Sequence, residues 1–213
     1  MKLKLVAYEK ALFEAFEEYC SDLATVEIIH GSVLEVEADA YVSPANSFGF
    51  MDGGIDTLYC RHFGIEIQTR VREAILYQKH GELLVGDAII VETGQAKTRF
   101  LIAAPTMRVP MVLGAETINP YLAMRATILM LRRGVIQTGA LKGEEVSAHV
   151  STVAVPGLGT GIGRVPPKLC ARQIRRAILD HRDKPHGLPQ SWSDASAEHQ
   201  LLFSDAIRDL QRQ

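Results

Sequence analysis

Two glycine-rich stretches, each directly after a short apolar run, most strongly constrain the fold of this chain. The first, residues 42–56, reads VSPANSFGFMDGGID, and the second, residues 156–163, reads PGLGTGIG. Glycines after a strand let successive backbone N–H groups point into one concavity, and a helix that follows adds the positive end of its dipole. The two stretches therefore predict two strand–loop–helix junctions that favour a phosphate-bearing ligand.

Strand-like and helix-like segments alternate along the chain. Short β-branched or apolar runs predict strands at 25–29, 39–43, 87–92, 99–104 and 151–155, with a hairpin turn around Gly94. Apolar residues at helical spacing predict helices at 11–20, 54–62, 65–79, 119–133 and 166–180. Because several strands are apolar enough to be buried on both faces, we expect an α/β fold with a largely parallel sheet between helical layers.

The 213 residues, 47% of them hydrophobic, are expected to form one domain over residues 1–213. Its core is predicted at about 25–182, and about 183–213 form a C-terminal extension. In that extension an irregular stretch, 185–193, precedes a predicted helix at about 197–210, and Trp192 is expected to fasten it to the body. The polar, glycine-containing stretch 138–149 is predicted to be an exposed insertion.

Net charge, cysteine content and hydropathy argue against several classes of protein. A net charge of -2 gives no basic field over the whole protein, so direct nucleic-acid binding is not expected, except to a modified nucleic acid as substrate. Three cysteines without short paired spacing argue against a disulfide framework. The N-terminus lacks the apolar core of a signal peptide, and no apolar run reaches membrane-spanning length. The chain is expected to be cytoplasmic, with no membrane partner.

The second loop does not match two common nucleotide motifs. No Gly-Lys-Ser/Thr follows it, so it is not a Walker A loop, and its glycines do not open an N-terminal βαβ unit as a dinucleotide fingerprint would. Open parallel sheets bind ligands beyond the carboxyl ends of their strands, so the two loops are expected to share one crevice.

The string DAYVSPANSFGFMDGGID resembles the signature of macro domains, the α/β modules that bind ADP-ribose. In that family a strand leads to an Asn and then to a glycine run closed by a hydrophobic residue and an Asp. The matching positions here are Asp39, Ala40, Val42, Asn46, Gly53, Gly54, Ile55 and Asp56. The later string VAVPGLGTGIGRVPP is similar to the family's other loop, at Pro156, Thr160, Gly161, Ile162 and Pro166 or Pro167. The resemblance extends over about 26–179.

The resemblance implies a three-layer α-β-α fold with a mostly parallel mixed sheet and ADP-ribose across its top. The second loop would wrap the diphosphate with backbone amides, and the first would face the distal ribose. The ligand-binding residues that this implies are Ser32, Val33, Ala45, Asn46, Asp52, Gly53, Gly54, Ile55, Pro156, Gly157, Leu158, Gly159, Thr160, Gly161, Ile162, Gly163 and Arg164.

The resemblance also implies two catalytic candidates. The amide of Asn46 can donate to and accept from ribose hydroxyls. Asp56 has two compatible interpretations, a helix cap or a carboxylate that activates water at the distal ribose. Three functions stay open. The first is an enzyme that removes ADP-ribose from a modified macromolecule or processes an ADP-ribose ester, and the second is a reader that binds ADP-ribose or another NAD-derived nucleotide without turnover. The third is a small α/β domain whose loops are structural and whose partner is a protein.

Three residues depart from the family pattern. Ser32 stands where members carry an Asp that recognises adenine, and Asp52 stands where many have glycine. Arg164 replaces an aromatic residue; it either contacts phosphate or a flat ring, or is a solvated arginine. Cys60 and His62 point in different directions on a predicted helix, so no metal is expected, and no cofactor either. The oligomeric state is left open.

Overall fold

The computed structural model describes residues 1–181 and 187–209. Its strands form one six-stranded sheet in the order β2-β1-β6-β3-β5-β4. Neighbouring strands are parallel, except that β4 runs antiparallel to β5. The strands are β1 (Lys2–Ala7), β2 (Val26–His30), β3 (Ala40–Ser43), β4 (Ile89–Glu92), β5 (Phe100–Ala103) and β6 (Thr152–Val155). The mostly parallel mixed sheet expected from the sequence is confirmed.

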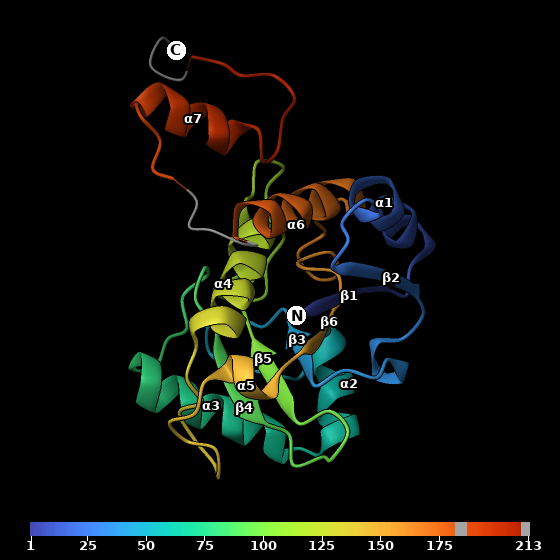
Figure 1. Cartoon of the computed structure of the whole chain (residues 1–213), viewed down its shortest axis with the longest axis vertical. Helices are drawn as coiled ribbons and strands as arrows, with labels where there is room; N and C mark the ends of the chain where they lie inside the picture. The colour runs from blue at the N-terminus through green and yellow to red at the C-terminus, as the bar shows by residue number, and fades with distance from the viewer. Residues whose placement is uncertain (182–186, 210–213) are drawn as a thin grey trace.

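Helices cover both faces of this sheet, which gives three layers (Figure 1). On one face lie α1 (Lys10–Cys20), α4 (Asn119–Arg133) and α6 (Pro167–His181), and on the other lie α2 (Gly54–Phe63) and α3 (Glu66–Lys79). Shorter elements are the 3₁₀ helix η1 (Val33–Glu35), α5 (Val146–His149) and α7 (Trp192–Gln200). The three-layer α-β-α architecture is therefore confirmed.

The strands alternate their buried side chains between the two layers. In β1, Leu5 packs with the cluster under α1, α4 and α6, and Val6 packs with the cluster under α2 and α3. Val153 and Ala154 of β6 divide in the same way. All four are at most 3% exposed. A strand buried on both faces needs apolar residues in succession, as in Leu5-Val6-Ala7 of β1 and Val153-Ala154-Val155 of β6.

β1 is a strand that was not predicted from the sequence. It lies between β2 and β6, pairing with both, although it begins with the charged alternation KLKL. Both lysines reach polar partners near the start of the strand: Lys2 pairs with Glu27 at 2.6 Å, and Lys4 Nζ donates to the carbonyl of Glu37 at 2.7 Å. A central strand tolerates lysines there because their aliphatic stems can pack while the amines reach polar partners at the edge of the sheet.

Two stretches differ from their prediction. The insertion at 138–149 is exposed over most of its length, but it ends in α5, whose Val146 is fully buried. The C-terminal helix is α7 rather than about 197–210; residue 210, the end of the predicted range, lies outside the described residues. Trp192 is 67% exposed at the start of this helix, so its predicted role as a fastener is wrong.

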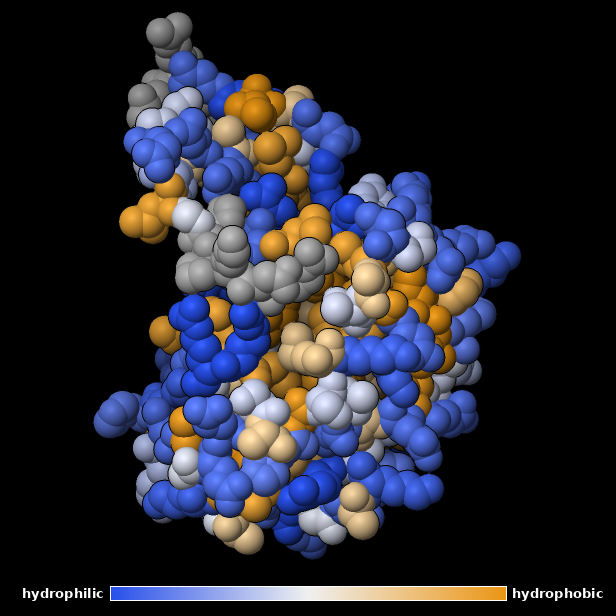
Figure 2. Space-filling view, viewed as in Figure 1, coloured by the Kyte–Doolittle hydropathy of each residue, from blue (hydrophilic) through white to orange (hydrophobic). Residues whose placement is uncertain are grey.

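The extension is instead fastened after α7. The buried Gln173 of α6 donates to the carbonyls of Thr117 (2.7 Å) and Leu202 (3.3 Å), and Arg172 pairs with Asp205. α7 itself stands away from the sheet beyond α4 and α6 (Figure 1), and Figure 2 shows hydrophobic surface on this part of the molecule. Within the described ranges, no helix combines the length and apolarity needed to cross a membrane.

Asp39 joins the starts of β3 and β6, which pair over only two residue positions. Its Oδ2 accepts four hydrogen bonds of 2.8–2.9 Å, from the backbone N–H and the hydroxyl of both Ser151 and Thr152. Burial acts to raise the pKa of Asp39, but these hydrogen bonds outweigh it and lower that pKa below its ordinary value. The carboxylate therefore supports the short strand pairing in its ionised form.

We predict that Asp39→Ala lowers the free energy of unfolding at pH 7 by about 2 kcal/mol, the scale of hydrogen bonds to a charged group. Because the pKa is lowered in the folded state, this contribution is present above pH 4 and is lost as the pH falls through the folded pKa. Urea unfolding at pH 7 and pH 3 measures it. Glu37→Ala, an exposed acid in the same segment, is the control, and an equal loss for both variants would contradict the prediction.

Candidate functional site

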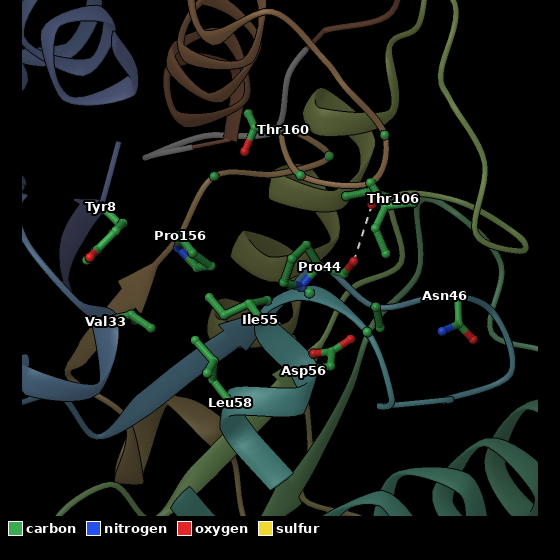
Figure 3. A pocket seen from close by; sticks show the side chains of 18 of the residues that line it. Tyr8, Val33, Pro44, Asn46, Ile55, Asp56, Leu58, Thr106, Pro156 and Thr160 are labelled. Carbon is green, nitrogen blue, oxygen red and sulfur yellow. Dashed lines mark hydrogen bonds between the residues drawn. The ribbon is translucent and has the colours of Figure 1, made fainter. Parts of the chain in front are cut away.

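A cavity of about 490 Å³ lies at the carboxyl edge of the sheet, between the loops that follow β3 and β6 (Figure 3). Because β3 and β6 are hydrogen-bonded neighbours running in the same direction, their following loops emerge side by side. We call residues 44–56 loop one and residues 156–166 loop two. The volume is in the range of small-molecule binding sites.

Most of the residues predicted to bind ligand line this one cavity, together with Asp56. They are Ser32, Val33, Ala45, Asn46, Asp52, Gly53, Gly54, Ile55, Pro156, Gly157, Gly159, Thr160, Gly161, Ile162 and Gly163. Two are placed elsewhere. Leu158 is fully buried in the core, and Arg164 is exposed with φ +52°, outside the cavity lining.

Other cavity-lining residues were not predicted, and most of them come from the ends of strands that the sequence reasoning did not use. Val6, Tyr8, Glu9 and Leu12 come from the end of β1 and the start of α1, and Thr106, Met107 and Pro110 follow β5; Gly31, Pro44, Phe50 and Leu58 complete the lining. The first group could be found only once β1 was recognised. The second follows a strand that was predicted, so the rule about carboxyl ends would have located it.

The segment after β5 holds both loops in place. Thr106 N–H donates to the carbonyl of Ala45 (3.1 Å), Ser47 N–H donates to the carbonyl of Arg108 (3.1 Å), and Leu113 N–H donates to the carbonyl of Gly163 (2.9 Å). The cavity therefore has walls from three neighbouring strand ends that are connected by backbone hydrogen bonds.

Loop two presents a run of unpaired backbone donors. The N–H groups of the five consecutive residues Gly159–Gly163 donate to no acceptor anywhere in residues 1–181 or 187–209. Gly159 and Gly163 are nevertheless buried. Buried backbone N–H groups are almost always paired, so the free ones of Gly159 and Gly163 beside a cavity indicate an acceptor from outside the chain. The three N–H groups between them are half-buried or exposed and are open to water or to a ligand.

Two glycines and a hydrogen bond to a cysteine sulfur hold the backbone of loop two in its curved path. A β-carbon at position 157 would collide with the side chains of Thr160 and Leu12, and Gly159 adopts φ +72°. Behind the loop, Leu158 N–H donates to Cys170 Sγ at 3.4 Å. Burial raises the pKa of the Cys170 thiol to about 12, so it stays a neutral acceptor at this position.

The glycine pair of loop one opens α2 opposite loop two. Gly53 is the N-cap, Gly54 has φ +56°, and a β-carbon at either position would lie within 4.0 Å of Ile162 Cδ1. The first N–H groups of α2 have no partner within the helix, and the helix dipole is positive at this end. Ile162 therefore spans from loop two to the glycine pair, where both loops offer backbone donors.

The amide of Asn46 is largely engaged with its own loop. Its Oδ1 accepts from the N–H groups of Phe48 (3.1 Å) and Phe50 (3.2 Å), and its Nδ2 donates to the carbonyl of Phe50 at 2.7 Å. In Figure 3 its side chain points into the turn of that loop rather than toward Asp56. One amide N–H is left for a ligand, so Asn46 can donate to a hydroxyl but has no free acceptor.

Asp56 is a buried carboxylate at the floor of the cavity. It lies in the first turn of α2 and is 6% exposed; Ser43 Oγ donates to its Oδ1 at 2.6 Å. Burial raises the pKa of Asp56 to about 6, and the Ser43 hydrogen bond offsets part of that rise. The N-cap of α2 is Gly53, so the helix-cap interpretation of Asp56 is wrong.

The charge of the lining is acidic. Glu9, Asp52 and Asp56 are among the cavity-lining residues, and no lysine or arginine is among those that the structure describes there. Any anion bound here is therefore held by backbone N–H groups and helix dipoles rather than by side-chain cations.

Comparison with known proteins places the chain in a family. The family model described as "Macro domain" matches residues 42–174. A protein from Aquifex aeolicus is 34% identical over 159 residues, which are 75% of this chain and 84% of the relative. A macro domain-containing protein from Caldanaerobacter subterraneus is 27% identical over 73% of this chain and 80% of the relative. The chain belongs to the macro domain family, as the sequence motifs indicated.

Solved structures show the same fold. The macrodomain of Mycobacterium tuberculosis DarG has a TM-score of 0.56 at 23% identity, covering 73% of this chain and 90% of that one. An Oceanobacillus iheyensis macrodomain variant with ADPR (ADP-ribose) has a TM-score of 0.57 at 18% identity, covering 74% and 78%.

We predict that Asp56→Asn makes the protein more stable at neutral pH. The raised pKa means that the folded state holds a proton between about pH 4 and 6 that the unfolded state has lost, so wild-type stability falls as the pH rises through this window. A rise from 3.8 to about 6 corresponds to roughly 3 kcal/mol.

Urea unfolding of both proteins from pH 4 to 7.5 measures the effect. The stability difference between variant and wild type should grow through pH 4–6 and then level off. Asp52→Asn, an exposed acid of the same loop, is the control and should give a flat difference. A flat difference for Asp56→Asn as well would contradict the burial argument.

Proposed function

We propose that this protein binds ADP-ribose in the cavity between loop one and loop two. The observation that carries the proposal is the run of five N–H groups without an acceptor in the described chain, Gly159–Gly163, which lines the same cavity as the glycine pair Gly53 and Gly54. A diphosphate supplies the several closely spaced oxygen acceptors that such a run needs. The related Oceanobacillus iheyensis macrodomain has been solved with ADPR and with ADP, which supports a nucleoside diphosphate as the ligand class.

The two ends of the cavity suit the two ends of ADP-ribose. Tyr8 and Val33 lie at one end in Figure 3 and Asn46 at the other, with Asp56 and Ile55 between them. The base would occupy the first end, and the distal ribose would lie near Asn46, whose remaining N–H can donate to a ribose hydroxyl. Because no side-chain cation contacts the diphosphate, affinity should depend only weakly on salt.

We further propose that the protein hydrolyses ADP-ribosyl linkages, with Asp56 as the base. A carboxylate whose pKa is about 6 is mostly ionised at pH 7 and is a better proton acceptor than an ordinary aspartate. In this reaction a water oxygen bonds to the anomeric carbon of the distal ribose while that carbon's bond to the acceptor breaks. The bonding electron pair leaves with the acceptor, and Asp56 takes the proton of the water. A reader without turnover is the alternative.

Calorimetric titration with ADP-ribose tests the binding proposal. Wild type should release or absorb binding heat, and Gly161→Glu should weaken binding by about tenfold or more, since it places a carboxylate among the phosphate donors. A β-carbon at position 161 meets nothing within 4 Å, so the variant should fold normally. Gly187→Glu, equally unobstructed but in the extension, is the control. Absence of heat for wild type at millimolar ADP-ribose would contradict the proposal.

A turnover assay with an ADP-ribosylated protein tests the catalytic proposal. Release of ADP-ribose should rise with pH through about 6 as Asp56 ionises, and Asp56→Asn should reduce the rate about 100-fold while leaving ADP-ribose affinity within threefold. Asp52→Asn is the control for loss of a nearby charge. If wild type binds ADP-ribose but Asp56→Asn releases it at the wild-type rate, Asp56 is not the base; if neither releases it, the protein is a reader.

A further inference from the structure

The base end of the cavity is formed by residues from two neighbouring strand ends. Tyr8 and Glu9 follow β1, and Ser32 and Val33 follow β2; all four line the cavity. Figure 3 shows the Tyr8 ring at this end, across from Val33. A flat ligand between these two strand ends would contact an aromatic ring, an apolar side chain, and the polar groups of Glu9 and Ser32.

Tyr8 and Glu9 are both exposed, and the polar atoms of their side chains are available to a ligand. Tyr8 is 78% exposed, and Glu9, the N-cap residue of α1, makes no side-chain capping hydrogen bond. Across residues 1–181 and 187–209, neither the Tyr8 hydroxyl nor the Glu9 carboxylate pairs with another group of the protein. A large aromatic side chain left uncovered at a cavity mouth, with a free carboxylate beside it, offers a stacking surface and a strong acceptor.

Ser32 is a weaker acceptor than a carboxylate because its hydroxyl is neutral and one of its two lone pairs is already used. Ser32 Oγ accepts the N–H of Leu34 at 3.3 Å and caps the 3₁₀ helix η1. It offers a ligand its O–H donor and one remaining lone pair. Glu9 is therefore the strong, free acceptor at this end of the cavity.

We propose that Glu9 determines the base specificity of the site, by accepting a hydrogen bond from the 6-amino group of a purine that stacks on Tyr8. This inference rests on the proposed binding of ADP-ribose. A hypoxanthine base differs from adenine at this position, presenting a carbonyl oxygen where adenine presents an amino donor. Opposite a carboxylate, that exchange replaces a charge-assisted hydrogen bond with two facing acceptors.

The test compares ADP-ribose with inosine diphosphate ribose by calorimetry, on wild type and Glu9→Gln. Wild type should bind ADP-ribose about tenfold more tightly. In Glu9→Gln the preference should shrink to about twofold or reverse, because the new amide can donate to the hypoxanthine oxygen. Glu17→Gln, an exposed acid of α1 outside the cavity, is the control and should keep the wild-type preference.

Tyr8 gives a second, independent measurement. Tyr8→Phe should keep ADP-ribose affinity within about twofold because the ring remains, whereas Tyr8→Ala should lose roughly tenfold. Since Tyr8 is exposed, neither variant should disturb folding, and thermal unfolding of the free proteins checks this.

The outcomes separate this inference from the function on which it rests. No binding of either nucleotide by wild type overturns the proposed function. The role of Glu9 is overturned if wild type binds ADP-ribose and inosine diphosphate ribose with equal affinity. It is also overturned if wild type prefers ADP-ribose and Glu9→Gln keeps the same preference. In both cases the proposed function stands. Equal loss in Tyr8→Phe and Tyr8→Ala would show that the hydroxyl, not the ring, holds the base.

Discussion

The short parallel pairing of β3 with β6 is the constraint on which the site depends. The two strands align over only two positions, yet their following loops supply the glycine pair and the run of free N–H groups. Asp39 strengthens this pairing at the far end of the strands with four hydrogen bonds to Ser151 and Thr152. A carboxylate on the edge of the sheet opposite the cavity thus helps to set the spacing between the two loops.

The cavity leaves polar groups unsatisfied at a cost in stability. Five N–H groups in loop two lack acceptors within the described chain, and Asp56 is buried with no basic partner. Asp56 and the two buried N–H groups, those of Gly159 and Gly163, raise the free energy of the protein without ligand. A ligand that satisfies them stabilises the fold through binding. Perturbed carboxylates and orphan donors gather at functional sites for this reason. The central strands are apolar where they are buried, and the free N–H groups and Asp56 lie together at the carboxyl edge of the sheet.

Local signals in the sequence were enough to predict the fold class and the positions of both glycine-rich loops. Turn-forming glycines after apolar strands are visible in a single sequence, and α4 was predicted at its observed bounds. The central strand β1 was not predicted because its two lysines give the alternating polar pattern of a strand with one solvent-exposed face. Tyr8 and Glu9, which follow β1, were therefore not predicted to line the cavity. The engagement of Asn46 with its own loop, and the burial of Leu158 behind loop two, depend on tertiary contacts that local sequence does not report.

Binding of a diphosphate to unpaired backbone N–H groups is the central claim, and amide NMR tests it most directly. In a titration of ¹⁵N-labelled protein with ADP-ribose, the largest downfield proton shifts should come from Gly159–Gly163 and from Gly53, as these donors acquire phosphate acceptors. Amides of the extension, such as those of α7, should not move. If the loop-two amides stay in place at saturating ligand while others shift, the diphosphate does not bind there.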